Sequence, residues 1–338
     1  MPSIAPTSLE SCFICLDDDR SKPFIQGPFC RNEGEQAYEG VVVTLQAYIE
    51  LIEVDLNVVT FGKHGRVHQD CLNKALDMKS ECPMCRLPHV KPIRIAYYPA
   101  DLSETNLSGL NFAGSNLSTA YLLEADLSRA NLIQANLSEA NLNHANLVAT
   151  NLSQANLSGA TLVEANLTAA ILNRANLTMA TLIRARLNAA DLYQANLIWA
   201  NISFANAARA NLNRAQLLGA NLSNSNFTGA NLGRANLNSA NLSGTRFVNA
   251  TLTRATLRAA NLTSSNLTSA YLTEAVLIGA RLNGAILSNA NLVRADLSNA
   301  SLVGANLTHA NLTGADLSGA DLSRAEFIGA DLNGVNFT

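Results

Sequence analysis

Six cysteines and two histidines near the start of the chain have the spacing of metal ligands. All six cysteines lie before residue 86, and four of them form two Cys-X-X-Cys pairs. Zn²⁺ binds four thiolate or imidazole ligands in a tetrahedron, and a Cys-X-X-Cys pair supplies two of them from one turn. The candidate ligands are Cys12, Cys15, Cys30, His64, His68, Cys71, Cys82 and Cys85. They predict two zinc ions, and buried free thiols are the alternative interpretation.

The order of these ligands resembles the RING finger in its variant with two histidines. The resemblance implies that pairs of ligands alternate between the two ions. Site one then consists of Cys12, Cys15, His68 and Cys71, and site two consists of Cys30, His64, Cys82 and Cys85. A RING-like domain over residues 12–86 would be a small α+β unit that depends on zinc to fold.

RING fingers recruit a ubiquitin-conjugating enzyme and have no nucleophile of their own. The resemblance therefore implies an E3 ubiquitin-protein ligase, with the conjugating enzyme and ubiquitin as partners. Ile14, Pro83 and Arg86 match the family's contacts with the conjugating enzyme. Arg86 is the candidate catalytic residue, because the family's arginine at this position bridges the conjugating enzyme and ubiquitin. Alternatively, Ile14 and Pro83 only pack within a structural zinc fold and Arg86 is a solvated surface residue.

Two features depart from the RING pattern. The gap between Cys30 and His64 holds 33 residues, far more than the family usually has. Residues 31–61 within it are predicted to be a β-rich insertion, and an acid or another ligand in place of Cys30 is an alternative for site two. Ala75 stands where many members have a tryptophan that packs on the conjugating enzyme, so its absence predicts weaker recruitment.

The rest of the chain, residues 100–338, repeats in blocks of five without a slip of register. The third residue of the block is Leu in 41 of 48 blocks and the first is Ala in 40 of 48, so these two positions form the predicted core. The third-position exceptions are Phe112, Ile202, Ala207, Phe227, Phe247, Phe327 and Phe337. A period of five fits neither an α-helix nor a flat strand. Blocks that bury positions one and three and then turn outward, four to a coil, satisfy it.

This pattern resembles the pentapeptide-repeat family. The resemblance implies a mostly β fold, a right-handed quadrilateral β-helix with four blocks per coil. About twelve stacked coils would make a rod of about 57 Å, at one strand spacing per coil. Residues 1–11 are predicted to be a flexible tail. Residues 87–99 are predicted to be either a plain linker or a capping strand marked by the alternation of Ile93, Ile95 and Tyr97.

Charge separates the two parts of the chain. Residues 100–338 contain thirteen Arg, no Lys and thirteen acids, so the repeat region is neutral in sum. Some pentapeptide-repeat proteins mimic duplex DNA and bind type II topoisomerases, which requires a strongly acidic rod, so that function is not expected. The net charge of −3 also argues against bulk attraction to nucleic acid or acidic membranes. The chain begins without a recognisable secretory signal and has no stretch that would span a bilayer.

Residues twenty apart should stack above one another if four blocks make a coil. One predicted column then contains Arg174, Arg214, Arg234, Arg254 and Arg294. Like charges one strand spacing apart repel, and a partner's carboxylates or phosphates would offset that repulsion. A solvated face with chance clustering is the alternative. Binding of nucleic acid to this column would depend strongly on salt.

A second column is predicted to expose apolar side chains. It contains Met179 and Trp199, the only tryptophan, beside Ile198, while Phe204 and Tyr193 lie on adjoining faces. Exposed apolar groups on a polar rod indicate a protein contact. A third column begins with Glu104, Glu124, His144 and Glu164, and this acidic start is too short to indicate a function.

The leading hypothesis is a RING-type ubiquitin ligase whose rod binds the substrate, and the alternative is a non-enzymatic protein-binding scaffold with a structural zinc cap. A zinc module joined to a pentapeptide rod suggests a bacterial effector in the host cytosol, and free thiols indicate a cytoplasmic location in general. The last coil offers an open edge, which predicts end-to-end association of two copies unless Phe337 plugs it.

Overall fold

The computed structural model describes residues 58–59, 94–95 and 101–338 of the chain. Two short strands, β1 (Val58–Val59) and β2 (Arg94–Ile95), pair in parallel, with Val58 opposite Arg94 and Val59 opposite Ile95. A strand therefore occurs within the segment 87–99, and the partner that it pairs with is β1. The eight predicted zinc ligands, together with Ile14, Ala75, Pro83 and Arg86, lie outside the described residues.

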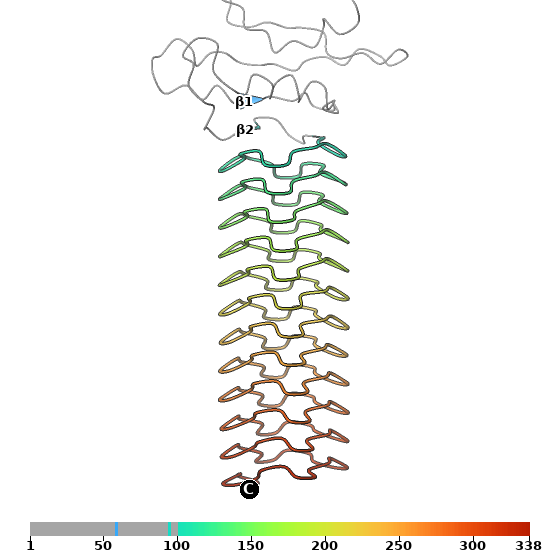
Figure 1. Ribbon diagram of the computed structural model, residues 1–338. Helices are drawn as coiled ribbons and strands as arrows, with labels where there is room; N and C mark the ends of the chain where they lie inside the picture. The colour runs from blue at the N-terminus through green and yellow to red at the C-terminus, as the bar shows by residue number, and fades with distance from the viewer. Residues whose placement is uncertain (1–57, 60–93, 96–100) are drawn as a thin grey trace, which may run out of the picture.

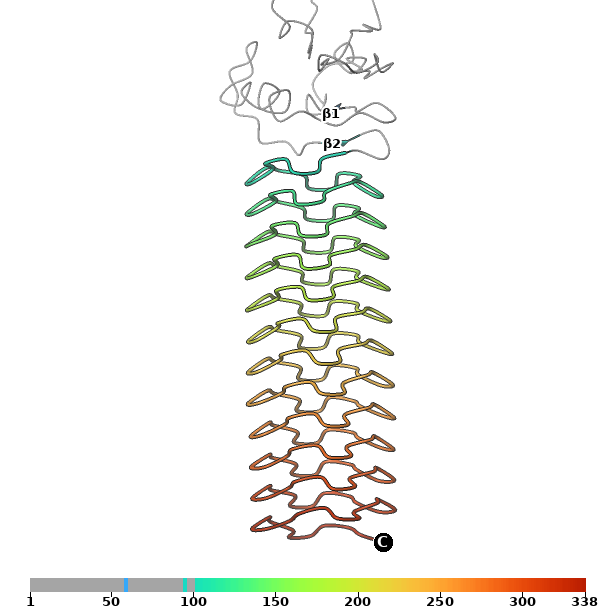
Figure 2. The same cartoon turned by 90° about the vertical axis from the view of Figure 1, so that its right-hand side faces the viewer.

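Residues 101–338 form a straight rod of stacked coils (Figures 1 and 2). Within each block the chain runs along one side of the coil and then turns at positions four and five. The backbone N–H of the next first position closes each turn by donating to the carbonyl of the third position, as Ala200 does to Leu197 at 3.0 Å. Four such turns return the chain to its starting side, which gives the predicted square cross-section.

Every fifth position from residue 104 to residue 334 has a positive φ, between 53° and 68°. This is the left-handed region that a turn requires at its third residue and that glycine enters at least cost. Thirteen of these positions are glycine and the others are mostly polar. The Asn or Asp at position two steadies many turns, because its Oδ1 accepts the backbone N–H two residues later, as Asn196 does from Ile198 at 3.2 Å.

Successive coils are joined by parallel bridges that connect each position-two residue to the one twenty residues later. They run without interruption from Asp101 paired with Tyr121 to Asp316 paired with Asn336. Amide side chains add a second ladder on the outside: the Nδ2 of Asn156 donates to Asn136 Oδ1 at 3.1 Å, and Asn176 donates to Asn156 at 3.0 Å. A 20-residue repeat therefore fixes which side chains are neighbours along the rod.

The interior holds the Leu and Ala of positions three and one, nearly all fully buried from residue 102 to residue 317. Threonine and serine at position one satisfy their hydroxyls on nearby carbonyls, as Thr150 Oγ1 does on Leu127 O at 2.6 Å. Ala207 is fully buried next to Phe227 in its column, and the Phe227 ring stacks on Phe247 with centroids 5.6 Å apart. The large rings thus compensate for the missing leucine volume.

Burial decreases in the last described coil. Leu332 and Phe337, which occupy inward positions, are exposed by 38% and 49%. Their counterparts one coil earlier, Leu312 and Leu317, are buried. Phe337 is thus about half-exposed, and nothing in the described residues stacks beyond it.

Candidate protein-binding face

One side of the rod brings the arginine column and the exposed tryptophan together. Five blocks lie above one another on this side, because each position-two residue bridges to the one twenty residues later. These blocks are 175–179, 195–199, 215–219, 235–239 and 255–259. We call this side the arginine–tryptophan face. One corner of this face consists of the fifth residues of the blocks that come immediately before these five in the chain. The other corner consists of the fifth residues of the five blocks themselves.

The first corner is the arginine column, residues 174, 194, 214, 234, 254, 274 and 294. Two of its arginines bind the next residue of the column: Arg174 Nε donates to Gln194 Oε1 at 2.9 Å, and Arg254 Nε donates to Glu274 Oε2 at 2.7 Å. The hydrogen bond from Arg254 holds the pKa of the Glu274 carboxyl below its usual range, and the charges of Arg254 and Arg294 act in the same direction. The same pair raises the pKa of Arg254.

Two arginines in the middle of this column keep their donors open. Arg214 and Arg234 are exposed, and neither side chain has a hydrogen-bond or ion-pair partner among residues 101–338. Each guanidinium has five N–H donors in a fixed fork that matches a carboxylate or a phosphate. The face therefore presents two adjacent, uncompensated cations about one strand spacing apart.

The second corner carries the apolar side chains. Met179 and Trp199 are exposed by 66% and 60%, and Ile198 is half-buried in the same turn as Trp199. The Trp199 ring lies over Gly219 of the next coil, so closely that a Cβ on Gly219 would come within 2.7 Å of its Cη2. Gly219 thus leaves room for the indole to lie over its backbone, while most of the Trp199 surface stays exposed.

Phe204 and Tyr193 border this surface without belonging to it. Phe204 is 56% exposed and ends the block that follows Trp199, so it lies one corner further round the coil. Tyr193 lies in the block that precedes the face and is half-buried. The structure therefore places Met179, Ile198, Trp199 and the arginines on one face, and it sets Phe204 apart.

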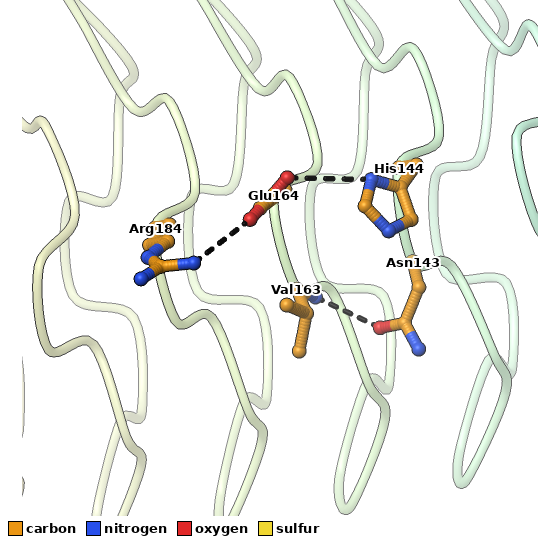
Figure 3. A network of polar contacts seen from close by, with 5 residues as sticks. All are labelled: Asn143, His144, Val163, Glu164 and Arg184. Atoms are coloured by element: carbon orange, nitrogen blue, oxygen red, sulfur yellow. Dashed lines mark hydrogen bonds and ion pairs between the residues drawn. The ribbon is translucent and has the colours of Figure 1, made fainter.

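The column that begins with acids changes sign along the rod. Figure 3 shows Glu164 between His144 and Arg184 of the neighbouring coils. Glu164 Oε2 lies 3.6 Å from His144 Nδ1, and its Oε1 lies 3.3 Å from Arg184 NH1. Beside them, the backbone N–H of Val163 donates to Asn143 Oδ1 at 2.9 Å. The acidic start of this column therefore ends at an ion pair between Glu164 and Arg184, the first arginine of the column.

The part of the chain that the structure describes shows no cluster of three or more His, Cys, Asp or Glu side chains arranged to hold a metal. No helix among those same residues is long and apolar enough to cross a membrane. The predicted site residues that remain for comparison are thus those of the rod surface. Gly219 is not among the predicted site residues, although a 20-residue step from Trp199 leads directly to it.

The coil architecture defines a β-solenoid, and comparison with known proteins assigns its family. The family described as Pentapeptide repeats (8 copies) matches overlapping segments that together run from residue 100 to residue 338. HetL from Nostoc sp. strain PCC 7120, a pentapeptide-repeat protein involved in regulating heterocyst differentiation, is 32% identical over 80% of this chain and 97% of its own, with a TM-score of 0.23. The chain belongs to the pentapeptide-repeat family.

Two further solved structures show the range of these similarities. Rfr23 from the cyanobacterium Cyanothece 51142 is 36% identical over 30% of this chain and 64% of its own, with a TM-score of 0.17. QnrB1, a plasmid-mediated fluoroquinolone resistance protein, is 20% identical over 64% of this chain and 89% of its own, with a TM-score of 0.27. No curated protein matches the chain.

Proposed function

We propose that the protein is a non-enzymatic binding scaffold whose rod holds another protein on the arginine–tryptophan face. The observation that carries this proposal is the exposure of Trp199 and Met179 at adjacent coils beside Ile198. Large side chains such as that of Trp contribute much of the binding energy in many protein interfaces. The rod supports this role mechanically, because each coil is hydrogen-bonded to the next along its whole length.

A photo-crosslinking amino acid in the full-length chain tests the proposal in an extract of the source organism. Gln216 is the probe position on the arginine–tryptophan face, and Arg246 is the control, since it is an exposed position-two residue two sides away. We expect a discrete protein adduct from position 216 that Trp199→Ala suppresses, and none of that size from position 246. Identical adducts from both positions, or none from 216, would contradict the proposal.

A second candidate function, ubiquitin transfer, is favoured by the order of the eight Cys and His residues between Cys12 and Cys85. On this proposal the N-terminal part binds two Zn²⁺ ions and recruits a ubiquitin-conjugating enzyme through Ile14, Pro83 and Arg86. The scaffold function would remain, with the bound protein as substrate.

End-to-end association through the last coil remains a separate proposal, and sedimentation of the full-length chain at increasing concentration would test it.

Zinc stoichiometry distinguishes the parts of this second candidate. We expect two Zn²⁺ per chain by metal analysis, and one after Cys30→Ser, because zinc sites need all four ligands to be closed. Arg86→Ala should retain both ions and lose ubiquitin-chain formation with a panel of conjugating enzymes. Zinc without chain formation by any enzyme would leave only the scaffold.

A further inference from the structure

The neutral charge of the rod hides three segments of opposite sign. Residues 101–164 contain six acids and one arginine, a net charge of −5. Residues 165–300 contain eleven arginines and three acids, a net charge of +8. Residues 301–338 contain four acids and one arginine, a net charge of −3. The basic middle is about seven coils long, or about 33 Å at one strand spacing per coil, and its first boundary is the contact of Glu164 with Arg184 (Figure 3).

The arginine–tryptophan face lies in this basic middle and has no acid of its own. None of its five blocks between residues 175 and 259 contains Asp or Glu, and Arg258 adds another cation to it. Only at Glu274 does the adjoining column supply a carboxylate, and that carboxylate is bound by Arg254. In this pair the carboxylate comes from the next coil and accepts a hydrogen bond from the guanidinium Nε. The pair therefore shows how an arginine of this column binds a carboxylate.

Arg214 and Arg234 have the same corner position as Arg254, but the residues one coil further along their column are Arg234 and Arg254 instead of an acid. Their repulsion is an unfavourable term that a bound anion would remove. Beside them, the half-buried Ile198 and Leu218 and the exposed Trp199 offer apolar contact. The surface thus combines two exposed arginines that have no acidic partner among residues 101–338 with neighbouring apolar side chains.

We propose that the arginine–tryptophan face binds an acidic segment of another protein, with two carboxylates on Arg214 and Arg234 and an apolar side chain against Trp199. This inference rests on the proposed scaffold function and adds the chemistry of the partner. The acidic ends of the rod restrict the partner's length, because a polyanion longer than the basic middle would meet like charge at residues 101–164 and 301–338. A short acidic peptide segment fits this limit, whereas long nucleic acid does not.

Selection from a displayed library of random 12-residue peptides on the immobilised full-length protein tests the inference. We expect enrichment of peptides that contain several Asp or Glu near one aromatic or aliphatic residue. The best peptide, synthesised with a fluorophore, should lose at least about tenfold in affinity in the double variant Arg214→Gln, Arg234→Gln, as expected for two charge-assisted contacts. Arg246→Gln, Arg281→Gln is the matched control: it removes the same charge from other sides of the rod and should change affinity less than about twofold.

The outcomes separate the inference from the function on which it rests. Selected peptides without acidic enrichment that still depend on Trp199 would overturn the acidic partner and leave the scaffold standing. A selection that yields no peptide sensitive to Trp199→Ala or to the double arginine variant would overturn both. Tighter binding of the oligonucleotide dT12 than of the best peptide, or displacement of that peptide by a second copy of the protein, would replace the proposed occupant. Circular dichroism of each variant checks that the rod is intact.

Discussion

Residues 101–164 and 165–300 share one interior but have opposite surfaces. Both segments bury Leu and Ala at the same two block positions and repeat the same hydrogen bonds between coils. Their net charges, −5 and +8, come only from the outward positions two, four and five. Fold and recognition are therefore encoded at different positions of the same five-residue block. The surface residues can vary without loss of packing in the core.

The strongest test of the shared interior is a leucine truncation in each segment. Leu132→Ala and Leu212→Ala remove side chains that are almost completely buried. Each should lower the free energy of unfolding by about 2–5 kcal/mol through lost burial and the cavity left behind. Denaturant unfolding followed by circular dichroism measures both. A loss in one segment several times that in the other would break the equivalence of the two interiors.

A glycine pair isolates the seat of Trp199, a feature that only the basic segment has. Gly219→Ala should destabilise the protein and displace the indole, because the new Cβ would overlap the ring and φ is +64° there. Gly279→Ala is the matched control in the same column: its φ is also +64°, but no atom lies within 4 Å of the new Cβ. Both share the left-handed backbone cost of about 1 kcal/mol, so the difference between them reports the ring.

Fluorescence reads this pair directly, since Trp199 is the only tryptophan of the chain. The emission maximum should shift in Gly219→Ala and stay unchanged in Gly279→Ala. Equal emission in both variants would show that the indole does not depend on Gly219. If the emission does shift, loss of peptide binding in Gly219→Ala but not in Gly279→Ala would tie the position of the indole to recognition.

The smallest expected effect concerns the Arg254–Glu274 pair and its pH dependence. The folded-state pKa of Glu274 is lowered, so its contribution to stability is present above the ordinary glutamate pKa and is lost as the pH falls through the lowered folded value. Glu274→Gln should therefore reduce the unfolding midpoint slightly at neutral pH and not at all in acid. The same variant should bind the acidic peptide more tightly, because it removes the carboxylate charge that competes with the peptide for Arg254. An unchanged affinity would argue against the arginine column as the carboxylate site.

The repeat region was predicted from sequence because its signal is local. The period of five and the burial of Leu and Ala follow from residue types at fixed spacing, and the coil of four blocks follows from that period together with the family that the repeat resembles. The arginine column followed from the same 20-residue step. The conformations of Trp199 over Gly219 and of Arg254 on Glu274 did not follow, because a long side chain has several rotamers that only its neighbours select.

The prediction from the Cys and His residues between positions 12 and 85 has a different basis. It predicts a chemistry, two zinc sites, from ligand type and spacing alone. No described residue tests it, so the zinc sites and the ligase remain proposals. The family assignment, in contrast, rests on residues 100–338.

The amino-acid sequence alone specifies which residues face inward and how the coils repeat, because Leu and Ala recur at the two positions of each block that pack in the narrow core. The stacking of the coils sets which arginines of the column already have a hydrogen-bond partner. Arg174 and Arg254 bind their neighbours in the column, whereas Arg214 and Arg234 do not. A side chain on a turn reaches the next coil, so its partner depends on how the coils stack and on its rotamer. Counting charges along the sequence gives neither of these.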